Sequence, residues 1–397
     1  MKILDFDGVY ADNNATTPID PRVRKAMTPF LEENFANPNS LYNHGRRSRK
    51  AVEEARERVA NMLNCATDEI VFTGSATESN NHVIKGTAFA RKDHGKHIVT
   101  SKTEHKCVLE ACRWLEGQGF EVTYLDVDEE GYISPSELKN ELREDTILVS
   151  IMLTNNEIGT VQPIEKTTRI VHDESSAYFH TDMAQCPGKM EVDVGKLGVD
   201  LATINAHKMY GPKGVGALYK KKDLDIDPLL HGGGQENGER SGTENVPAIV
   251  GFGKAAEIVE ERWEEEGEKL REMHQKLVES IQGSIDNTEV NGPVDGRLPG
   301  NMNISFIGVE GEALVLRLDD LGINTATGSA CSSEELKSSH VLDALGKGPE
   351  VAHSSLRISF GRFNTMDDVN TVVEALRKEV RELRSITALD EKGKTGD

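Results

Sequence analysis

One lysine stands in a setting that indicates covalent chemistry. Lys208 lies in the stretch Ala206-His-Lys-Met-Tyr-Gly-Pro-Lys-Gly214, after an apolar run at 201–204 that predicts a strand and before a turn at Gly211-Pro212. A lysine at such a strand end is partly desolvated, which disfavours the ammonium and favours the free amine. A free amine attacks carbonyl groups and forms a Schiff base with them. A surface lysine in a loop would show the same local pattern, so the interpretation depends on the rest of the chain.

A second stretch has the form of an anion-binding site. Gly74-Ser-Ala-Thr-Glu-Ser79 follows an expected strand at 69–73 and opens an expected helix. The start of a helix exposes backbone N–H groups, here including that of Ala76, and the Thr77 hydroxyl adds a further donor. A phosphate suits such donors, although an ordinary helix cap would look the same.

Further polar residues follow other expected strands. His105 can stack on an aromatic ring or move a proton, although a lone histidine is more often structural. Asp182 and Gln185 follow one strand, and a carboxylate in that place can hold a pyridine nitrogen in its protonated form. Asn156 is placed similarly after the preceding strand.

One of the five cysteines lies among small residues. Cys331 is in Thr327-Gly-Ser-Ala-Cys-Ser-Ser333, a loop in which a thiol is both accessible and mobile. The others lie in or beside expected helices and strand ends, where packing explains them: Cys65, Cys107, Cys112 and Cys186. Because the chain has no Cys-x-x-Cys and no paired metal-ligand spacing, we expect free thiols in a reducing compartment.

Alternating strands and helices must position these residues. The expected strands are 69–73, 97–100, 121–125, 146–152, 178–181, 201–204 and 215–219, with helical periodicity between them. This alternation predicts an α/β domain with a mostly parallel sheet and ligands at the strand C-terminal ends. A long helical pattern at 253–281 is expected to bridge to an α+β segment with strands at 303–307 and 356–359.

The composition bounds the class of protein. The chain has 397 residues, enough for two domains, with 37% hydrophobic and 28% charged residues. A formal charge of −21 argues against nucleic acid or an anionic membrane as a partner. No apolar run approaches the roughly 20 residues that span a bilayer, and the N-terminus does not resemble a signal peptide, so we expect a cytoplasmic protein.

Taken together, these motifs closely resemble the pyridoxal-phosphate-dependent cysteine desulfurases, a class V aminotransferase family of fold-type I. The resemblance runs from about Val9 to the region of Arg362, and four motifs carry it: Ala206-His-Lys-x-Tyr-Gly-Pro-Lys-Gly214, Arg240-Ser-Gly-Thr-Glu-Asn245, Gly328-Ser-Ala-Cys331 and Leu356-Arg-x-Ser-x-Gly-Arg362. It implies a large cofactor-binding domain at 15–262 with a seven-stranded, mainly parallel sheet. It also implies a smaller α+β domain, formed by 1–14 and 263–397, that carries the cysteine loop.

The resemblance assigns a role to each candidate residue. Lys208 would form the Schiff base and carry the proton at the substrate α-carbon, His105 would stack on the ring as an acid–base group, and Cys331 would attack the substrate sulfur. Arg357, with Asn156, would bind the substrate carboxylate. The other implied cofactor contacts are Asp182 at the pyridinium nitrogen, Gln185 and Asn156 near the ring hydroxyl, and Ala76, Thr77, Asn205, His207 and, across a dimer interface, Thr243 at the phosphate.

Some residues depart from the family pattern. Asn205 stands where a serine usually binds the phosphate, which leaves the affinity for the cofactor open. Tyr42 replaces a common histidine, and Asn14 sits where a small residue is usual, neither of which is expected to affect the core chemistry.

The implied activity is the conversion of L-cysteine to L-alanine by a homodimer, with a persulfide formed on Cys331. The sulfur would then pass to an acceptor, either an iron–sulfur scaffold protein or a thiolation pathway. No metal site is implied, apart from transient ligation of an iron–sulfur cluster by Cys331. Two alternatives stay open: a selenocysteine lyase or cysteine sulfinate desulfinase with the same cofactor, and a non-catalytic scaffold, against which the intact Lys208, Asp182, His105 and Cys331 argue.

Overall fold

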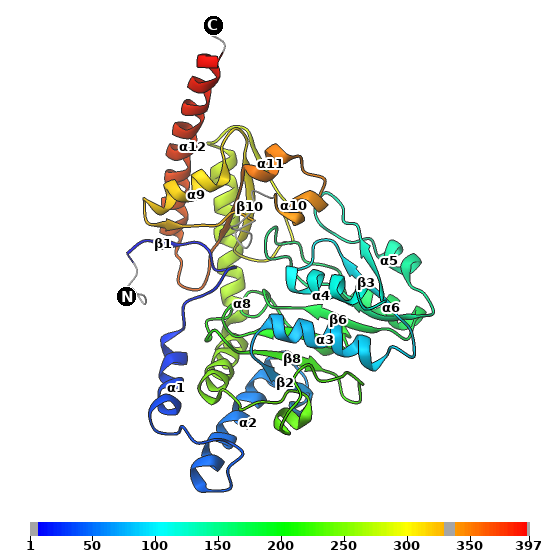
Figure 1. The fold of residues 1–397 in the computed structure, drawn as a ribbon. Coiled ribbons are helices and arrows are strands. Elements are labelled where there is room, and N and C mark those ends of the chain that lie inside the picture. The colour runs from blue at the N-terminus through cyan, green and yellow to red at the C-terminus, as the bar shows by residue number, and fades with distance from the viewer. Residues whose placement is uncertain (1–6, 329–337, 395–397) are drawn as a thin grey trace.

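The protein has two lobes joined by one long helix (Figure 1). The computed structural model describes residues 7–328 and 338–394, with side chains to residue 386. We call the part around the larger sheet the large lobe and the part around the three-stranded sheet the small lobe. Within the described ranges, none of the helices combines the length and the apolar character needed to cross a membrane.

The large lobe contains a seven-stranded sheet in which only β8 runs antiparallel to its neighbours. The predicted seven-stranded, mainly parallel sheet is thus confirmed, and each strand lies within two residues of its expected bounds. In spatial order the strands are β2 (Ile70–Thr73), β8 (Gly216–Lys220), β7 (Leu201–Asn205), β6 (Tyr178–Asp182), β5 (Thr146–Ser150), β3 (His97–Ser101) and β4 (Glu121–Leu125).

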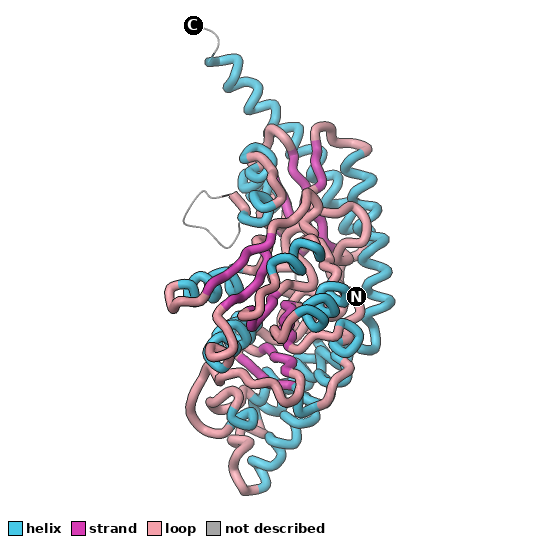
Figure 2. Tube along the Cα trace, turned by 90° about the vertical axis from the view of Figure 1, so that its right-hand side faces the viewer, coloured by secondary structure: helices cyan, strands magenta, loops and turns pink. Residues whose placement is uncertain are grey.

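Helices cover both faces of this sheet (Figure 2). Its strands are therefore buried on both sides, which fits their nearly continuous apolar sequences. Along β2, for example, Val71 joins the core under one set of helices, whereas Ile70 and Phe72 join the core on the opposite face. The first core includes α3 (Ala76–Ala90) and α4 (Lys106–Glu116). The second includes α2 (Asn43–Leu63), α6 (Ile164–Glu174) and the first half of α8 (Val246–Gln282). The remaining helices of the large lobe are α1 (Pro21–Glu32), α5 (Pro135–Glu141) and α7 (Val194–Leu197).

The bridging helix α8 is longer than the sequence pattern predicted. It starts at Val246 instead of 253, because Asn245 caps its N-terminus and a proline occupies its first turn. Its first half contributes Ile249 and Phe252 to the core of the large lobe. Its second half contributes Leu270 and Leu277 to the core of the small lobe, so one rigid element belongs to both cores.

The small lobe is built on an antiparallel sheet with the order β12 (Ser355–Ser359), β10 (Asn301–Phe306) and β9 (Thr288–Val290). The N-terminal strand β1 (Val9–Tyr10) pairs in parallel with β11 (Ile323–Asn324) and brings Val9 and Ala11 into this core. Packed around the sheets are α9 (Gly311–Asp319), α10 (His340–Ala344), α11 (Pro349–His353) and α12 (Met366–Lys394). The last turns of α12 extend beyond the rest of the molecule (Figures 1 and 2).

Candidate active site

The predicted polar residues of the large lobe meet at the C-terminal ends of the parallel strands. Asp182 is the last residue of β6 and is only 7% exposed. Its Oδ2 accepts a hydrogen bond of 2.7 Å from Asn80 Nδ2, and its Oδ1 accepts one of 2.8 Å from the backbone of Ala184. Because Asn80 belongs to α3, this bond ties the carboxylate to the helix whose first turn contains Ala76 and Thr77.

The first turn of α3 is approached closely by β8, and the charge of its Glu78 is balanced by Arg240. Ser75 caps the helix, with its Oγ accepting from the Glu78 N–H at 3.1 Å. Glu78 also accepts from the Gly74 N–H at 2.9 Å and pairs with Arg240 at 2.7 Å. A side chain at Gly216 would bring its Cβ to 2.8 Å from the Ser75 carbonyl carbon, so glycine lets β8 approach this turn. The exposed Thr77 and the N–H groups at the helix start therefore suit a phosphate.

His105 caps α4 and is held as a neutral ring. Its Nδ1 accepts from the Cys107 N–H at 3.2 Å, which assigns the proton of the neutral imidazole to Nε2. Burial lowers the pKa of His105, and Lys208 acts in the same direction, whereas Asp182 opposes both. The charges of Asp182 and Lys208 thus lie close enough to His105 to influence its titration.

Cys107 is a neighbour of this histidine that the sequence interpretation attributed to packing alone. Its Sγ lies 3.0 Å from His105 Nδ1 and 3.2 Å from Asn80 Nδ2. Burial, followed by the charge of Asp182, raises the pKa of the Cys107 thiol to about 12, so the group is protonated and can donate to the imidazole. The i, i+2 spacing from His105 across a helix start was the signal that could have indicated this contact.

The loop that carries Lys208 is fixed by the N-terminal segment. Thr17 donates to the His207 carbonyl from both its N–H and its Oγ1, each at 2.9 Å, and its Oγ1 accepts from the Tyr210 N–H at 2.9 Å. Asn205 Oδ1 accepts from the Lys208 N–H at 3.3 Å, so the residue in place of the usual serine caps the lysine loop. Burial, then the charge of Lys208, lowers the pKa of His207 to about 4.

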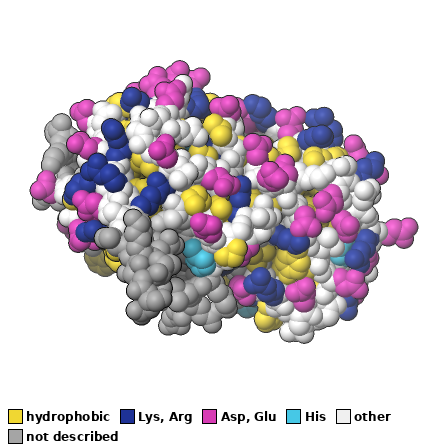
Figure 3. Space-filling model, turned by 90° about the horizontal axis from the view of Figure 1, so that it is seen from above, with side chains coloured by type: hydrophobic (Ala, Val, Ile, Leu, Met, Phe, Trp, Pro, Cys, Tyr) yellow, Lys and Arg dark blue, Asp and Glu magenta, His cyan; other side chains and the backbone are white. Residues whose placement is uncertain are grey.

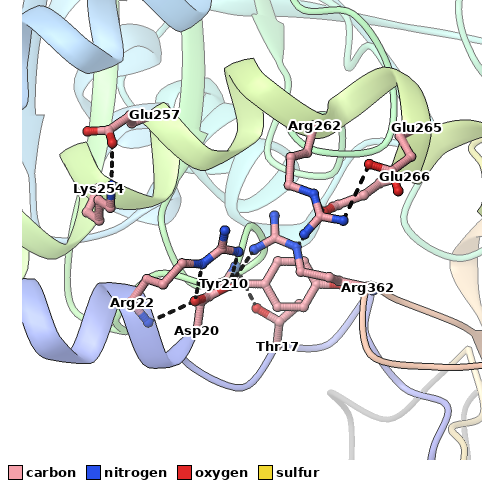
Figure 4. Close-up of polar contacts among 10 residues, drawn as sticks. All are labelled: Thr17, Asp20, Arg22, Tyr210, Lys254, Glu257, Arg262, Glu265, Glu266 and Arg362. Carbon is pink, nitrogen blue, oxygen red and sulfur yellow. Dashed lines mark hydrogen bonds and ion pairs between the residues drawn. The ribbon is translucent and has the colours of Figure 1, made fainter. Parts of the chain in front are cut away.

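A buried ion-pair cluster joins this loop to the small lobe (Figure 4). Arg362 pairs with Asp20 at 2.9 Å and with Glu266 at 2.7 Å, and its guanidinium carbon lies 4.2 Å from the centre of the Tyr210 ring. Burial would raise the pKa of Asp20, but the hydrogen bonds and charge of Arg22 together with the charge of Arg362 outweigh it and lower the pKa to about 2. The cluster therefore stays charged at neutral pH and anchors the lysine loop between the lobes.

Arg357 presents an unsatisfied donor from the central part of β12. Its Nη2 pairs with Asp12 at 2.7 Å and its Nη1 donates to the Asn156 carbonyl at 3.3 Å. Among the described residues, its buried Nε finds no hydrogen-bond partner. A buried donor of this kind can bind a ligand carboxylate.

A buried lysine that the sequence analysis did not identify lies beside Gln185. Lys189 is 3% exposed, and its Nζ donates to Asn14 Oδ1 at 2.7 Å and to Gln185 Oε1 at 3.4 Å. Gln185 Nε2 donates to the Asn14 carbonyl at 3.0 Å, and Asn14 Nδ2 donates to the Asn156 carbonyl at 3.1 Å. Asn14, expected to be peripheral, is thus central to the site. No simple spacing in the sequence links residue 14 to residue 189.

Two expected site residues are not brought to this cluster by the described structure. Thr243 is exposed and lines a separate cavity of about 180 Å³ with Gly74, Gly214 and Arg240. Cys331 lies outside the described residues. The described residues that flank its segment meet at Glu157: Ser339 Oγ donates to Glu157 Oε2 at 2.5 Å, and a Cβ at Gly328 would lie 2.5 Å from the same oxygen. Burial raises the pKa of Glu157.

The donor set matches the polar atoms of pyridoxal phosphate. The α3 N-terminus suits its phosphate, the Asp182 carboxylate suits its pyridine nitrogen, and the Lys208 amine is of the kind that reacts with its aldehyde. In the part of the chain that the structure describes, no group of three or more His, Cys, Asp or Glu is arranged to hold a metal ion.

Comparisons with known proteins relate almost the whole chain to other sequences and structures. Residues 9–372 match the family model described as Aminotransferase class-V. The chain is 50% identical over 379 residues to the cysteine desulfurase IscS of Dictyoglomus turgidum, covering 96% of both proteins. It is also 50% identical over 384 residues to the cysteine desulfurase IscS of Methanosarcina thermophila, covering 97% of this chain and 95% of the relative. A solved NifS-like protein superposes with a TM-score of 0.90 at 39% identity, covering 94% of this chain and all of the other.

Proposed function

The chain belongs to the pyridoxal-phosphate-dependent cysteine desulfurases of the class V aminotransferase family, and from this membership we propose a role for each residue of its active site. The enzyme converts L-cysteine to L-alanine and transfers the sulfur to an enzyme cysteine. Bound pyridoxal phosphate supplies an electron sink for bond breaking at the carbons of the amino acid. The roles below follow from what this chain's own groups can bind, orient or protonate.

The large lobe holds the cofactor and moves protons. The N–H groups of Ala76 and Thr77 hold the phosphate, and Asp182 keeps the pyridine nitrogen protonated. Lys208 binds the cofactor and carries the proton at the substrate α-carbon. His105 offers the proton of Nε2 toward the site. One set of contacts supports this assignment: Asn80 Nδ2 lies 2.7 Å from Asp182 Oδ2 and 3.2 Å from Cys107 Sγ, and that Sγ lies 3.0 Å from His105 Nδ1, so the carboxylate and the imidazole belong to one cluster.

Further contacts complete the cofactor and substrate sites. His207 and Asn205 act at the phosphate end of the lysine loop, and Asn156 with Gln185 lies at the ring hydroxyl. Arg357 binds the substrate carboxylate through a guanidinium that Asp12 already orients. Cys331 attacks the substrate sulfur as a thiolate and becomes a persulfide.

The domain division follows the two cores. We place a large domain at 15–262 and a small domain at 1–14 with 263–397. Support comes from the packing: Val9 and Ala11 join the core of the small lobe, whereas Val23 joins that of the large lobe. Along α8, Val259 still belongs to the large-lobe core and Leu270 already belongs to the other.

The active protein is a homodimer in which Thr243 serves the partner's cofactor. Large apolar side chains at the end of α1 and before α2 support a self-association surface, since Leu31, Phe35, Leu41 and Tyr42 are 63%, 78%, 87% and 60% exposed. Mixing Lys208→Ala and Thr243→Ala protomers should restore one intact site per heterodimer. Confirmed subunit exchange without recovered activity would show that Thr243 does not act across the interface.

The sulfur acceptor is a protein of the iron–sulfur assembly pathway, and the enzyme works in the cytoplasm. The names of the relatives, which identify them as cysteine desulfurases, support transfer of sulfur to an acceptor. The net charge of −21 and the mixture of acidic and basic side chains on the face shown in Figure 3 give no support to a nucleic-acid partner.

The test of the proposed function is product analysis after a single turnover. With L-cysteine and bound pyridoxal phosphate, the enzyme should release one equivalent of alanine and gain one sulfur on the peptide that contains Cys331. If the enzyme acted only on cysteine sulfinate, releasing alanine and sulfite, or only on selenocysteine, the result would instead support one of the related lyases.

A further inference from the structure

The buried ammonium of Lys189 has no carboxylate partner. Among the described residues, its hydrogen bonds go to the amide oxygens of Asn14 and Gln185, and no acidic group lies within ion-pair distance. Burial lowers the pKa of Lys189 to about 7, and the nearby charges of Lys208 and Arg357 act in the same direction. A buried cation without a counter-ion is costly, so the protonated form of Lys189 would be favoured by an anionic ligand nearby.

The two amides beside Lys189 are oriented by its charge. In its protonated form Lys189 has three donors and no acceptor, so only the oxygen end of each amide can then face it. Gln185 therefore directs its NH₂ end away from Lys189, with one N–H donating to the Asn14 carbonyl. Asn14 likewise turns its Nδ2 toward the Asn156 carbonyl, which also receives Arg357 Nη1.

We propose that Lys189 and Asn14 are positioning residues that couple the cofactor end of the active site to its substrate end. Through Gln185, Lys189 presents an amide N–H to the ring hydroxyl of pyridoxal phosphate. If the amide were reversed, its oxygen would face the oxygen of that hydroxyl. Through Asn14, the same ammonium holds the Asn156 carbonyl against Arg357. This inference rests on the proposed roles of Gln185 and Arg357.

The geometry of the backbone around Lys189 favours a fixed position for its side chain. Its own N–H donates to the Cys186 carbonyl at 3.0 Å, in a turn that follows β6. Gly267 of α8 packs against this turn, since a Cβ there would lie 2.6 Å from the Lys189 carbonyl oxygen. The helix α8 thus packs directly against the backbone of Lys189, the residue that links the two ends of the site.

A double-mutant cycle separates positioning from general structural support. Lys189→Met keeps much of the side-chain volume but removes all donors, and Gln185→Met removes the amide. We expect each single variant to weaken the binding of pyridoxal phosphate about tenfold, or about 1.4 kcal/mol, in absorbance titrations of the apoenzyme. Because Lys189 acts through Gln185, the double variant should be no weaker than the weaker single variant. The proposal would be overturned if the losses of affinity in the two single variants multiplied in the double variant, or if Lys189→Met bound the cofactor with wild-type affinity.

Asn14 provides a second, independent readout. Asn14→Ser removes the bridge to the Asn156 carbonyl and should raise the KM for L-cysteine several-fold with a smaller change in kcat. An unchanged KM would contradict the coupling to Arg357, and this variant keeps the proposal testable if Lys189→Met does not fold. Lys196→Met, at an exposed lysine paired with Glu191, is the matched control and should behave like wild type. If the wild-type chain itself fails to bind the cofactor, the proposed function is wrong; if it binds and the variants match it, only this inference is wrong.

Discussion

The two walls of the active site are positioned by different means. On the large-lobe wall, functional residues stand at the ends of regular elements: Asp182 ends β6, and His105 caps α4. On the small-lobe wall, Arg357 depends on Asp12 and on a carbonyl that Asn14 holds in place. The first wall combines the ends of regular elements with side-chain bonds such as that from Asn80 to Asp182, whereas Arg357 on the second wall depends on side-chain contacts from residues far away in the chain. Substitutions on the first wall should therefore change the chemistry, and those on the second should change binding or the joining of the lobes.

The largest effect is expected at Lys208. Lys208→Ala removes the amine that binds the cofactor and moves the substrate proton, so activity should fall by at least about a thousandfold, the scale of losing a nucleophile or base. The lobes should stay folded, since the anchoring bonds of this loop come from Thr17 and Asn205. Alanine formation and far-ultraviolet circular dichroism measure the two outcomes. Substantial alanine formation by the variant would contradict the assignment.

Cys331→Ser should abolish sulfur release and leave the large-lobe wall intact. The variant should bind pyridoxal phosphate with wild-type affinity and show the same visible absorption, because the groups that hold the cofactor come from other segments. Sulfide assays with L-cysteine and reductant give the activity, and absorbance titration gives the affinity. Full sulfide release would show that another cysteine serves as acceptor.

The buried cluster between the lobes should contribute to stability. Asp20→Asn removes one of the two carboxylates paired with Arg362 and leaves Glu266 as the other, so it should lower the free energy of unfolding by roughly 3 kcal/mol, the lower end for broken buried pairs. Since the pKa of Asp20 is lowered to about 2, its contribution is present above the ordinary aspartate pKa of about 4 and is lost as the pH falls toward 2. Urea unfolding at neutral pH and at about pH 3 should show a smaller difference between wild type and variant at the lower pH.

The smallest effect is expected at Cys107. Cys107→Ala removes a thiol donor from His105 Nδ1, which stabilises the neutral ring. The pKa of His105 should rise, and the acid limb of the kcat profile should move to higher pH by some tenths of a unit. Cys112→Ala, at a buried cysteine of the same helix, is the control and should leave the limb in place. Identical limbs in all three proteins would limit Cys107 to packing.

The contrast between the walls also explains what the sequence could predict. The strands of the large sheet, and the residues that follow them, were predicted because alternation and turn signals mark strand ends. The length of α8 was underestimated because its first turns are apolar on several sides and lie in the large-lobe core. Resemblance to a family added the roles of His105 and Arg357, which periodicity alone does not assign.

The side-chain network behind the small-lobe wall could not be predicted in the same way. The contacts of Lys189 with Asn14, and of Arg362 with Asp20, join residues far apart in the chain. Nothing local marks them, because each depends on how the two lobes pack around α8. Asn14 illustrates the point, since its contacts with Lys189 and with the Asn156 carbonyl have no counterpart in the local sequence pattern.

Two lysines near the proposed cofactor site, the partly buried Lys208 and the buried Lys189, allow a direct test of the central claim. The holoenzyme is reduced with borohydride, digested, and the peptide that carries the phosphopyridoxyl group is identified by mass spectrometry. We predict the label on Lys208 and none on Lys189, whose Nζ is engaged by Asn14 and Gln185. A label on Lys189, or on no lysine of the chain, would contradict the account of this active site.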